Sequence, residues 1–331
     1  ILSVNSKFFE QFASLGYFIS LLLLLGLFVF GNTVSGATSW YNIGGISFQP
    51  SELAKVATAL MIASLLSKFQ SDIQTPRTLF KIGAYVLFPF FLIVLQPDPG
   101  SALVFGAFFF PLFREGLHYS YLIIFLSVLS LFFITLSFPF GVVVGIIILL
   151  IFLLYFIFKR LNSKIKIWPF LFFLMISIGF SFSVDYIFDN IFQQRHRDRI
   201  NIVLGKEVDI QGVGYNINQS KIAIGSGGLK GKGFLEGTQT KGDFVPEQHT
   251  DYIFSTIGEE WGFRGGFFLI FLFCLLILRI ILQAEKQINK FRRIYSYGIA
   301  GLIFIHFFIN IGMSLGMVPT IGIPLPFVSY G

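Results

Sequence analysis

Apolar segments of membrane-spanning length follow one another along almost the whole chain, and they decide its fold class. We distinguish nine, some of them short, at residues 9–30, 47–67, 79–95, 100–113, 119–138, 140–158, 167–187, 252–282 and 294–318. A spanning helix needs about 20 apolar residues. Charged residues make up only 12% of the chain, whereas soluble domains contain about 25%. We therefore predict an all-α polytopic membrane bundle of about nine or ten helices and exclude a water-soluble fold.

Two of these segments have unusual boundaries. Segment 100–113 is too short to span a membrane alone, and Pro99 and Pro111 bound it, so we expect a broken or tilted helix. A tenth segment is expected to begin after Pro326. The chain starts at Ile1 without a methionine and stops at Gly331, so both ends are expected to be trimmed.

Basic residues alternate between successive turns and orient the chain. The turns 68–81, 114–118, 159–166 and 279–293 hold 3, 1, 4 and 5 Lys and Arg residues, whereas 31–46, 96–99 and 138–139 hold none. Cytoplasmic loops carry the excess of positive charge, so the second set is expected to face outward. The net charge of +7 thus reflects membrane topology, not nucleic-acid binding. The single cysteine, Cys274, excludes an internal disulfide.

One long polar segment, residues 188–251, interrupts the apolar pattern and lies between helical parts at 1–187 and 252–331. We call it the long loop. It holds eight of the 24 Lys and Arg residues. A loop of about 60 residues in a compact protein is usually functional or disordered, and the patterning of this one favours function. By parity it faces outward, because loops longer than about 60 residues escape the positive-charge rule. We expect it to carry the active face.

A glycine-dense run, GSGGLKGKG at 225–233, is the first chemical feature of the long loop. It is not a Walker A motif, because Lys232 is followed by Gly233 and not by Ser or Thr. Flexible backbone N–H groups beside Lys230 and Lys232 could contact a pyrophosphate. A glycine-rich surface turn without a ligand is an equally good interpretation.

The second feature is Asp251, which ends the long loop at the start of a membrane helix. A carboxylate at a membrane–water boundary, flanked by basic residues, can serve as a general base if burial keeps its pKa suitable. His249 lies two residues away, but one histidine and one carboxylate give only a weak metal signal. After Asp251, Gly258, Gly262 and Gly266 form two overlapping GxxxG patterns, which typically let another helix approach closely. Glu259 and Glu260 follow about two turns deeper, and one of them is expected to face the interior.

Two ionisable residues, Glu52 and Lys55, lie three apart near the start of the second segment. They therefore share one helix face. Ionisable groups inside a membrane are costly and usually pair or face a wet cavity. The pair is either an interfacial ion pair with a structural role or a part of a polar cavity.

Asp98 and Trp40 lie in two of the turns expected to face outward. Asp98 stands in a Pro-Asp-Pro-Gly sequence, which is ordinary turn chemistry. Trp40 is either an interfacial aromatic anchor or a platform for a sugar or lipid, and the sequence favours the anchor.

Four stretches together resemble a known family, the SEDS proteins (shape, elongation, division and sporulation). They are SWYNIGGISFQPSELAK, QPDPGSAL, QSKIAIGSGGLKGKGFLEGTQTKGDFVPEQHTDYIFSTIGEEWGF and NIGMSLGMVPTIGIPLPFVSYG, from about Trp40 to Gly331. Within the family, the GTQ…VPEQHTDYIF stretch is more similar to the RodA branch than to the FtsW branch. The chain looks like a fragment that lacks the first helices and the C-terminal end of the family fold.

The resemblance implies a ten-helix peptidoglycan glycosyltransferase of the bacterial inner membrane, with its large loop on the periplasmic side. Such an enzyme polymerises lipid II during cell elongation, with a class B penicillin-binding protein and the elongation machinery as partners. It implies that Asp251 is the essential loop carboxylate, that Glu52 and Lys55 are the buried pair, and that Trp40 and Asp98 match further motif positions. Substrate-binding or cavity-shaping roles are expected for Trp40, Glu52, Lys55, Asp98, Lys221, Lys230, Lys232 and His249.

Some of the implied picture is left open. No metal ligands are assigned, but a divalent cation, Mg²⁺ or Mn²⁺, is retained as a cofactor that would help the pyrophosphate leave. Three apolar segments lie between 114 and 187 where the resemblance leads us to expect one. A flippase that transports lipid II is the alternative function, and a non-catalytic scaffold for the penicillin-binding protein is the third.

Overall fold

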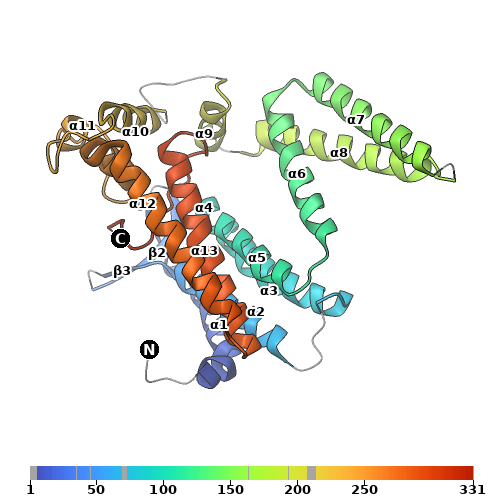
Figure 1. The fold of residues 1–331 in the computed structure, drawn as a ribbon, viewed down its shortest axis with the longest axis horizontal. Helices are drawn as coiled ribbons and strands as arrows, with labels where there is room; N and C mark the ends of the chain where they lie inside the picture. The colour runs from blue at the N-terminus through green and yellow to red at the C-terminus, as the bar shows by residue number, and fades with distance from the viewer. Residues whose placement is uncertain are drawn as a thin grey trace. The chain divides into compact units, whose positions relative to one another are not determined.

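The computed structural model describes residues 6–34, 36–44, 46–68, 73–162, 164–192, 194–206 and 214–330. Contacts divide the chain into two compact units, which are described separately. Unit 1 comprises residues 1–118 and 216–331, and unit 2 comprises residues 119–215. Figure 1 shows the helices and strands with the labels used below.

Unit 1 is built around α2 (Pro50–Ser67), which contacts both α1 (Ser6–Phe30) and α13 (Lys290–Ser314). Its buried positions include small residues, Ala54, Ala59 and Ala63 among them. Small side chains let helices pack closely within a membrane. A Cβ atom on Gly298 of α13 would lie 3.4 Å from Ala59 Cβ, which is ordinary van der Waals contact. This packing places the two polar ends of α2 at fixed positions beside α13.

A small antiparallel sheet follows α1 and was not expected from the sequence. It consists of β1 (Asn32–Val34), β2 (Ala37–Ile43) and β3 (Ile46–Phe48), in that order. Two hydrogen bonds attach it to the helices. Tyr41 donates its hydroxyl to the Leu23 carbonyl in α1 at 2.8 Å, and the Thr38 amide donates to the Gln96 carbonyl after α3 (Pro76–Leu95) at 3.1 Å. The sheet sets the approach of the chain into α2.

The run 99–114 confirms the prediction of a broken helix. It divides into α4 (Pro99–Leu103), the 3₁₀ helix η1 (Val104–Phe108) and α5 (Phe109–Arg114). Gly100 allows the first turn to lie against the Ile321 carbonyl, since a Cβ atom there would come within 2.5 Å of that oxygen. At the other side, Gly301 of α13 lies against the Ala107 carbonyl. The run is thus held between α13 and the stretch that follows α13.

Helix α12 (Ile253–Glu285) is interrupted near its start. Gly262 has φ 64° and ψ −162°, which is not helical, and this region of backbone space is open almost only to glycine. A Cβ atom there would collide with the amide nitrogen of Gly231. The prediction that Gly258, Gly262 and Gly266 let another helix approach closely holds for Gly258 alone. Gly258 faces Ile224 of α10 (Tyr215–Ser226), Gly262 faces the glycine-dense run, and Gly266 faces Phe254 of its own helix.

Unit 2 consists of α6 (Tyr119–Ser137), α7 (Phe140–Leu161), α8 (Trp168–Asn190) and α9 (Gln194–Val203). Helix α8 packs against both α6 and α7. Thr135 of α6 donates to Ser181 of α8 at 3.1 Å, and both side chains are buried. The three apolar segments predicted between 119 and 187 therefore form three separate helices.

Seven helices in the described part of the chain are long and apolar enough to cross a membrane, namely α1, α3, α6, α7, α8, α12 and α13. Together with α2 and the run 99–114 they account for all nine predicted segments. The last one ends earlier than predicted, at Ser314, before Gly316 adopts φ 71°. The described residues 326–330 form turns, so the expected tenth helix does not begin within them.

We predict that Gly262→Ala destabilises the protein because alanine strains this backbone conformation, at about 1–3 kcal/mol, and collides with Gly231. Thermal unfolding of the purified protein in detergent measures the effect. The control is Gly83→Ala in α3, where a Cβ atom meets nothing within 4 Å. That control should stabilise slightly, since alanine favours helices over glycine by about 1 kcal/mol. Equal stability of the two variants would contradict the role given to Gly262.

Candidate active site

Asp251 lies at the junction of the long loop and the stretch that follows α13. We call this stretch, residues 315–330, the C-terminal segment. The half-buried Asp251 carboxylate faces Gly322, where a Cβ atom would lie 3.2 Å from Asp251 Oδ2. Gly322 has φ 71°, so the close approach and the backbone conformation both favour glycine. Helix α12 takes Tyr252 as its N-cap, so Asp251 precedes the capping position.

Several hydrogen bonds hold the C-terminal segment against the residues around Asp251. The Tyr252 hydroxyl, which is almost fully buried, bonds Thr320 Oγ1 at 2.7 Å. Ser329 donates to the Thr250 carbonyl at 2.6 Å, and the Tyr330 amide donates to the His249 carbonyl at 2.8 Å. His249 thus takes part through its backbone carbonyl, and the residue as a whole is exposed. Asp251 therefore lies where two segments about 70 residues apart in sequence are bonded together.

The predicted Glu52–Lys55 pair is present and has a third member. Lys55 Nζ lies 2.5 Å from Glu52 Oε1 and 2.9 Å from His306 Nε2 in α13. The Lys55 side chain is only 2% exposed, whereas that of Glu52 is 48% exposed. His306 Nδ1 lies 3.3 Å from the Pro324 carbonyl. The pair is therefore connected to the C-terminal segment that also contacts Asp251.

Asp98 is a buried cap and not an exposed turn residue. One carboxylate oxygen accepts from the Ser101 amide at 3.0 Å, which caps α4, and the other accepts from Gln49 Nε2 at 3.1 Å. Gln49 immediately precedes α2. Since Gly100 touches Ile321, this cluster also borders the C-terminal segment. The structure thus places Asp98, the Glu52–Lys55 pair and Asp251 around one stretch of chain.

Glu259 forms a separate polar cluster that explains much of the glycine-dense run. Its carboxylate is 0% exposed and accepts hydrogen bonds from the Gln239 and Thr240 amides, both at 2.9 Å. Lys232 Nζ lies 2.7 Å from Glu259 Oε1. Glu260 is also buried, so both acids face the interior where the sequence led us to expect one. The Lys232 charge is thereby directed at Glu259.

The interpretation of the glycine-dense run as a phosphate cradle is wrong for three of its amides. The Lys232 and Gly233 amides donate to the Glu259 and Glu260 carbonyls, both at 3.0 Å, and the Gly231 amide donates to Gly227 at 2.8 Å. These glycines serve close packing, because a Cβ atom on Gly227 or Gly231 would collide with a carbonyl oxygen of α12. Lys230 remains exposed, so its predicted contact with substrate is untouched by this packing.

The remaining predicted residues lie at the edges of this arrangement. Lys221 of α10 is close to the C-terminal segment, since a Cβ atom on Gly316 would come within 2.5 Å of Lys221 Nζ. Trp40 is half-buried in β2, opposite Asn32. Whether Trp40 is an anchor or a platform stays a prediction.

Sequence reasoning assigned no role to His306, Asn310 or Gln49. Asn310 is fully buried in α13 and contacts the Asp251 carbonyl. A usable signal was present: His306 and Asn310 are polar residues four apart in an apolar helix, a pattern that indicates an interior-facing functional site. For the predicted cation, the described residues contain no group of three or more His, Cys, Asp and Glu side chains that could hold a metal. A divalent cation stays a prediction.

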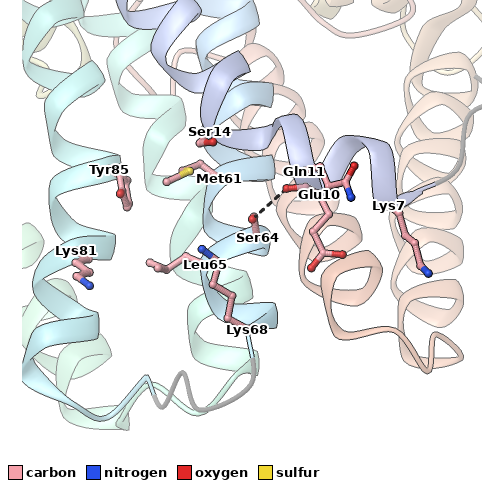
Figure 2. A pocket seen from close by; sticks show the side chains of 10 residues that line it. All are labelled: Lys7, Glu10, Gln11, Ser14, Met61, Ser64, Leu65, Lys68, Lys81 and Tyr85. Carbon is pink, nitrogen blue, oxygen red and sulfur yellow. Dashed lines mark hydrogen bonds between the residues drawn. The ribbon is translucent and has the colours of Figure 1, made fainter.

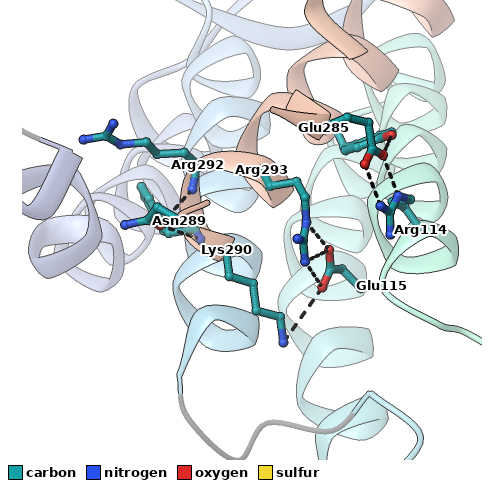
Figure 3. A network of polar contacts seen from close by, with 9 residues as sticks. Arg114, Glu115, Glu285, Asn289, Lys290, Arg292 and Arg293 are labelled. Carbon is teal, nitrogen blue, oxygen red and sulfur yellow. Dashed lines mark hydrogen bonds and ion pairs between the residues drawn. The ribbon is translucent and has the colours of Figure 1, made fainter. Parts of the chain in front are cut away.

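Two further polar regions lie at the end of α2 that is away from Glu52 and Lys55. The 18 residues of α2 make it about 27 Å long. Lys68 and Lys81 help to line a cavity of about 640 Å³ beside Glu10 (Figure 2), and none of the predicted site residues lines it. Figure 3 shows the ion pairs that join the end of α5 to the end of α12 and the start of α13. Arg114 forms a bidentate pair with Glu285 at 2.7 Å, and Arg293 pairs with Glu115 at 3.0 Å. These contacts are structural.

The sequence profile of the FtsW, RodA and SpoVE proteins, described as cell cycle proteins, matches residues 1–144 and 140–331. The chain belongs to the SEDS family. The two matches overlap at residues 140–144, inside the region where the sequence has three apolar segments and the resemblance leads us to expect one. That two of these helices are additional to the family fold stays a prediction.

Similar proteins share this membership. The Escherichia coli K12 peptidoglycan glycosyltransferase MrdB is 36% identical over 99% of this chain and 75% of its own length. The Treponema pallidum peptidoglycan glycosyltransferase RodA is 32% identical over 94% of this chain and 76% of its own. These relatives confirm the family and the glycosyltransferase class.

Solved structures confirm the fold. A structure on the coordination of polymerization and crosslinking by a peptidoglycan synthase complex contains a chain that is 26% identical, with a TM-score of 0.68, over 99% of this chain and 78% of that one. The crystal structure of Thermus thermophilus RodA gives a TM-score of 0.57 at 24% identity, over 99% of this chain and 74% of that one. The predicted all-α membrane bundle is therefore correct.

We predict unequal effects of breaking the Glu52–Lys55 pair. Glu52→Ala leaves Lys55 buried beside His306 without its salt-bridge partner, which costs up to about 3–5 kcal/mol. Lys55→Met should cost less, because the half-exposed Glu52 is already partly solvated. Unfolding in detergent measures each single variant and the double variant. The double variant should lose less than the sum of the two, and strict additivity would contradict direct pairing.

Proposed function

We propose that the protein polymerises lipid II, the undecaprenyl-pyrophosphate-linked disaccharide peptide, into glycan strands during cell elongation. Asp251 acts as the general base. The observation that carries the proposal is the placement of this carboxylate: half-buried, at the end of the long loop, and held against Gly322 of the C-terminal segment. A fixed base at the edge of a membrane bundle suits a reaction between lipid-linked sugars.

The chemistry assigned to Asp251 is proton removal from a sugar hydroxyl. A hydroxyl is a poor nucleophile, so Asp251 accepts its proton while the oxygen attacks the anomeric carbon of the donor. The new C–O glycosidic bond forms as the bond from the anomeric carbon to the pyrophosphate oxygen breaks, and undecaprenyl pyrophosphate leaves. Positive side chains stabilise the charge on the leaving group. Lys221 and the exposed Lys230 are the candidates, because Lys232 is committed to Glu259.

Orientation in the bacterial inner membrane follows from the charge pattern. Lys286, Lys290, Arg292 and Arg293 lie in and just after the turn between α12 and α13. The excess of positive charge in cytoplasmic loops predicts that this end faces the cytoplasm, and therefore that Asp251 and the long loop face the periplasm. Lipid II must be presented on that side for wall synthesis. The partner is a class B penicillin-binding protein of the elongation machinery, and the similarity to a chain of a peptidoglycan synthase complex supports this assignment.

The buried polar cluster in the helices is the feature that favours the alternative, a lipid II flippase. A transport path uses polar residues near the middle of the membrane on broken helices. Lys55, however, is 2% exposed and has both Glu52 and His306 as partners. A buried ammonium group with two partners argues for a structural role near the active site and against a headgroup path.

For the general base, we predict that Asp251→Asn lowers the rate of lipid II polymerisation by roughly 100–10,000-fold while folding stays normal. Asparagine keeps the shape of the side chain but cannot accept the proton. The assay uses purified protein with its penicillin-binding partner. The control is Asp243→Asn, an exposed acid of the same loop with φ 53°, a conformation that asparagine tolerates. An Asp251→Asn enzyme within a few-fold of wild type would remove the general base.

For the orientation, we predict that Lys230→Cys in a Cys274→Ala background reacts with an impermeant thiol reagent added from the periplasmic side. Lys230 is exposed, so labelling depends on membrane side alone. The matched variant Lys286→Cys, in the turn after α12, should be labelled only after the membrane is disrupted. The reverse pattern would overturn the orientation and the placement of Asp251.

A further inference from the structure

Helix α13 carries a buried polar face within an otherwise apolar helix. His306, Asn310 and Ser314 follow at intervals of four residues and therefore lie on one side. Asn310 and Ser314 are 0% exposed and His306 is 7% exposed. Buried polar side chains inside a membrane are costly, so each needs partners that justify it.

Asn310 uses its amide nitrogen as a double donor. Its Nδ2 lies 2.9 Å from the Asp251 carbonyl oxygen and 2.8 Å from the Ile323 carbonyl oxygen. An amide nitrogen has two hydrogens, so both are committed. The opposite orientation would direct the Asn310 side-chain oxygen at two carbonyl oxygens and is repulsive. The chemistry of the two acceptors therefore fixes the orientation of the side chain.

The two carbonyls belong to the two segments that define the candidate site. One is the backbone of Asp251 itself. The other follows Gly322, the residue that the Asp251 carboxylate faces. One side chain thus sets the distance between the carboxylate's own backbone and the segment against which the carboxylate lies.

The second anchor is itself held from the same helix face. His306 Nε2 lies 2.9 Å from Lys55 Nζ, and an ammonium group can only donate. Nε2 therefore accepts, the proton of the neutral ring is on Nδ1, and Nδ1 donates to the Pro324 carbonyl. Pro324 adjoins Ile323, so the Asn310 contact is made to a segment that has its own attachment to α13.

We propose that Asn310 is a positioning residue for Asp251, which registers the carboxylate against the C-terminal segment through two backbone carbonyls. The inference rests on the proposed role of Asp251 in lipid II polymerisation. Misplacing a reacting group by about 1 Å can cost 100-fold in rate. Loss of Asn310 should therefore act on the rate of the chemical step and leave substrate binding largely in place.

The test compares Asn310→Leu, which keeps the approximate size and removes both donors, with Phe308→Leu. Phe308 lies on the same helix, is 53% exposed, and contacts neither segment of the site in the bonds described above. With purified protein and its penicillin-binding partner, Asn310→Leu should lower kcat by about 10- to 100-fold, with KM for lipid II within three-fold. Phe308→Leu should change neither. If Asn310→Leu does not fold, Asn310→Ser, which keeps one donor, should give an intermediate loss.

A double-mutant cycle separates positioning from general damage to the fold. In an Asp251→Asn background, Asn310→Leu should add less than three-fold to the loss, because there is no longer a base to position. Multiplicative losses, or a wild-type kcat in Asn310→Leu, would overturn the positioning role while leaving the proposed function intact. A wild-type protein that does not polymerise lipid II would overturn the proposed function, and the role of Asn310 with it.

Discussion

A polar group buried in a membrane protein has no water available as an alternative partner, so it must find its partners within the chain. Three buried groups of unit 1 meet this constraint, and each of them joins segments that are distant in sequence. Glu259 gathers the amides of residues 239 and 240 and the Lys232 ammonium. Lys55 brings α2 to α13, and Asn310 brings the end of the long loop to the C-terminal segment. The position of the candidate active site follows from these contacts.

Close backbone contact complements the polar contacts. The glycine-dense run lies directly on the first turns of α12, and Gly262 interrupts the helix so that its backbone can accept this run. Backbone hydrogen bonds join the two segments, and in one of them the Phe263 amide donates to the Gly228 carbonyl at 2.8 Å. Side chains at these positions would separate the two segments. The long loop is therefore built into the helical bundle along the first turns of α12.

The class of fold could be predicted from the sequence, because apolar segments of spanning length indicate the helices. The cost of ionisable groups in membranes indicates Glu52 and Lys55 as a pair, which the structure contains. The roles of the site residues stay predictions. The roles of the glycines could not be predicted, because a glycine pattern is the same whether a helix, a loop or a phosphate approaches it. Asp98 was interpreted as a turn residue because its partner, Gln49, is 49 residues away. The four-residue spacing of His306 and Asn310 indicates a polar helix face, but their partners lie in the C-terminal segment, whose path the sequence does not show.

The contact between the glycine-dense run and α12 also governs where the long loop can change in length. Gly227 and Gly231 each lie against a particular carbonyl of α12, that of Gly258 and that of Glu260, so these two glycines fix the register of the run on the helix. The stretch from Gly233 to Asp251 is thereby tied at both ends, with Glu259 holding its middle. A residue inserted there must displace either the Asp251 carboxylate or the amides that bind Glu259. Related proteins should therefore keep a constant spacing after Gly233.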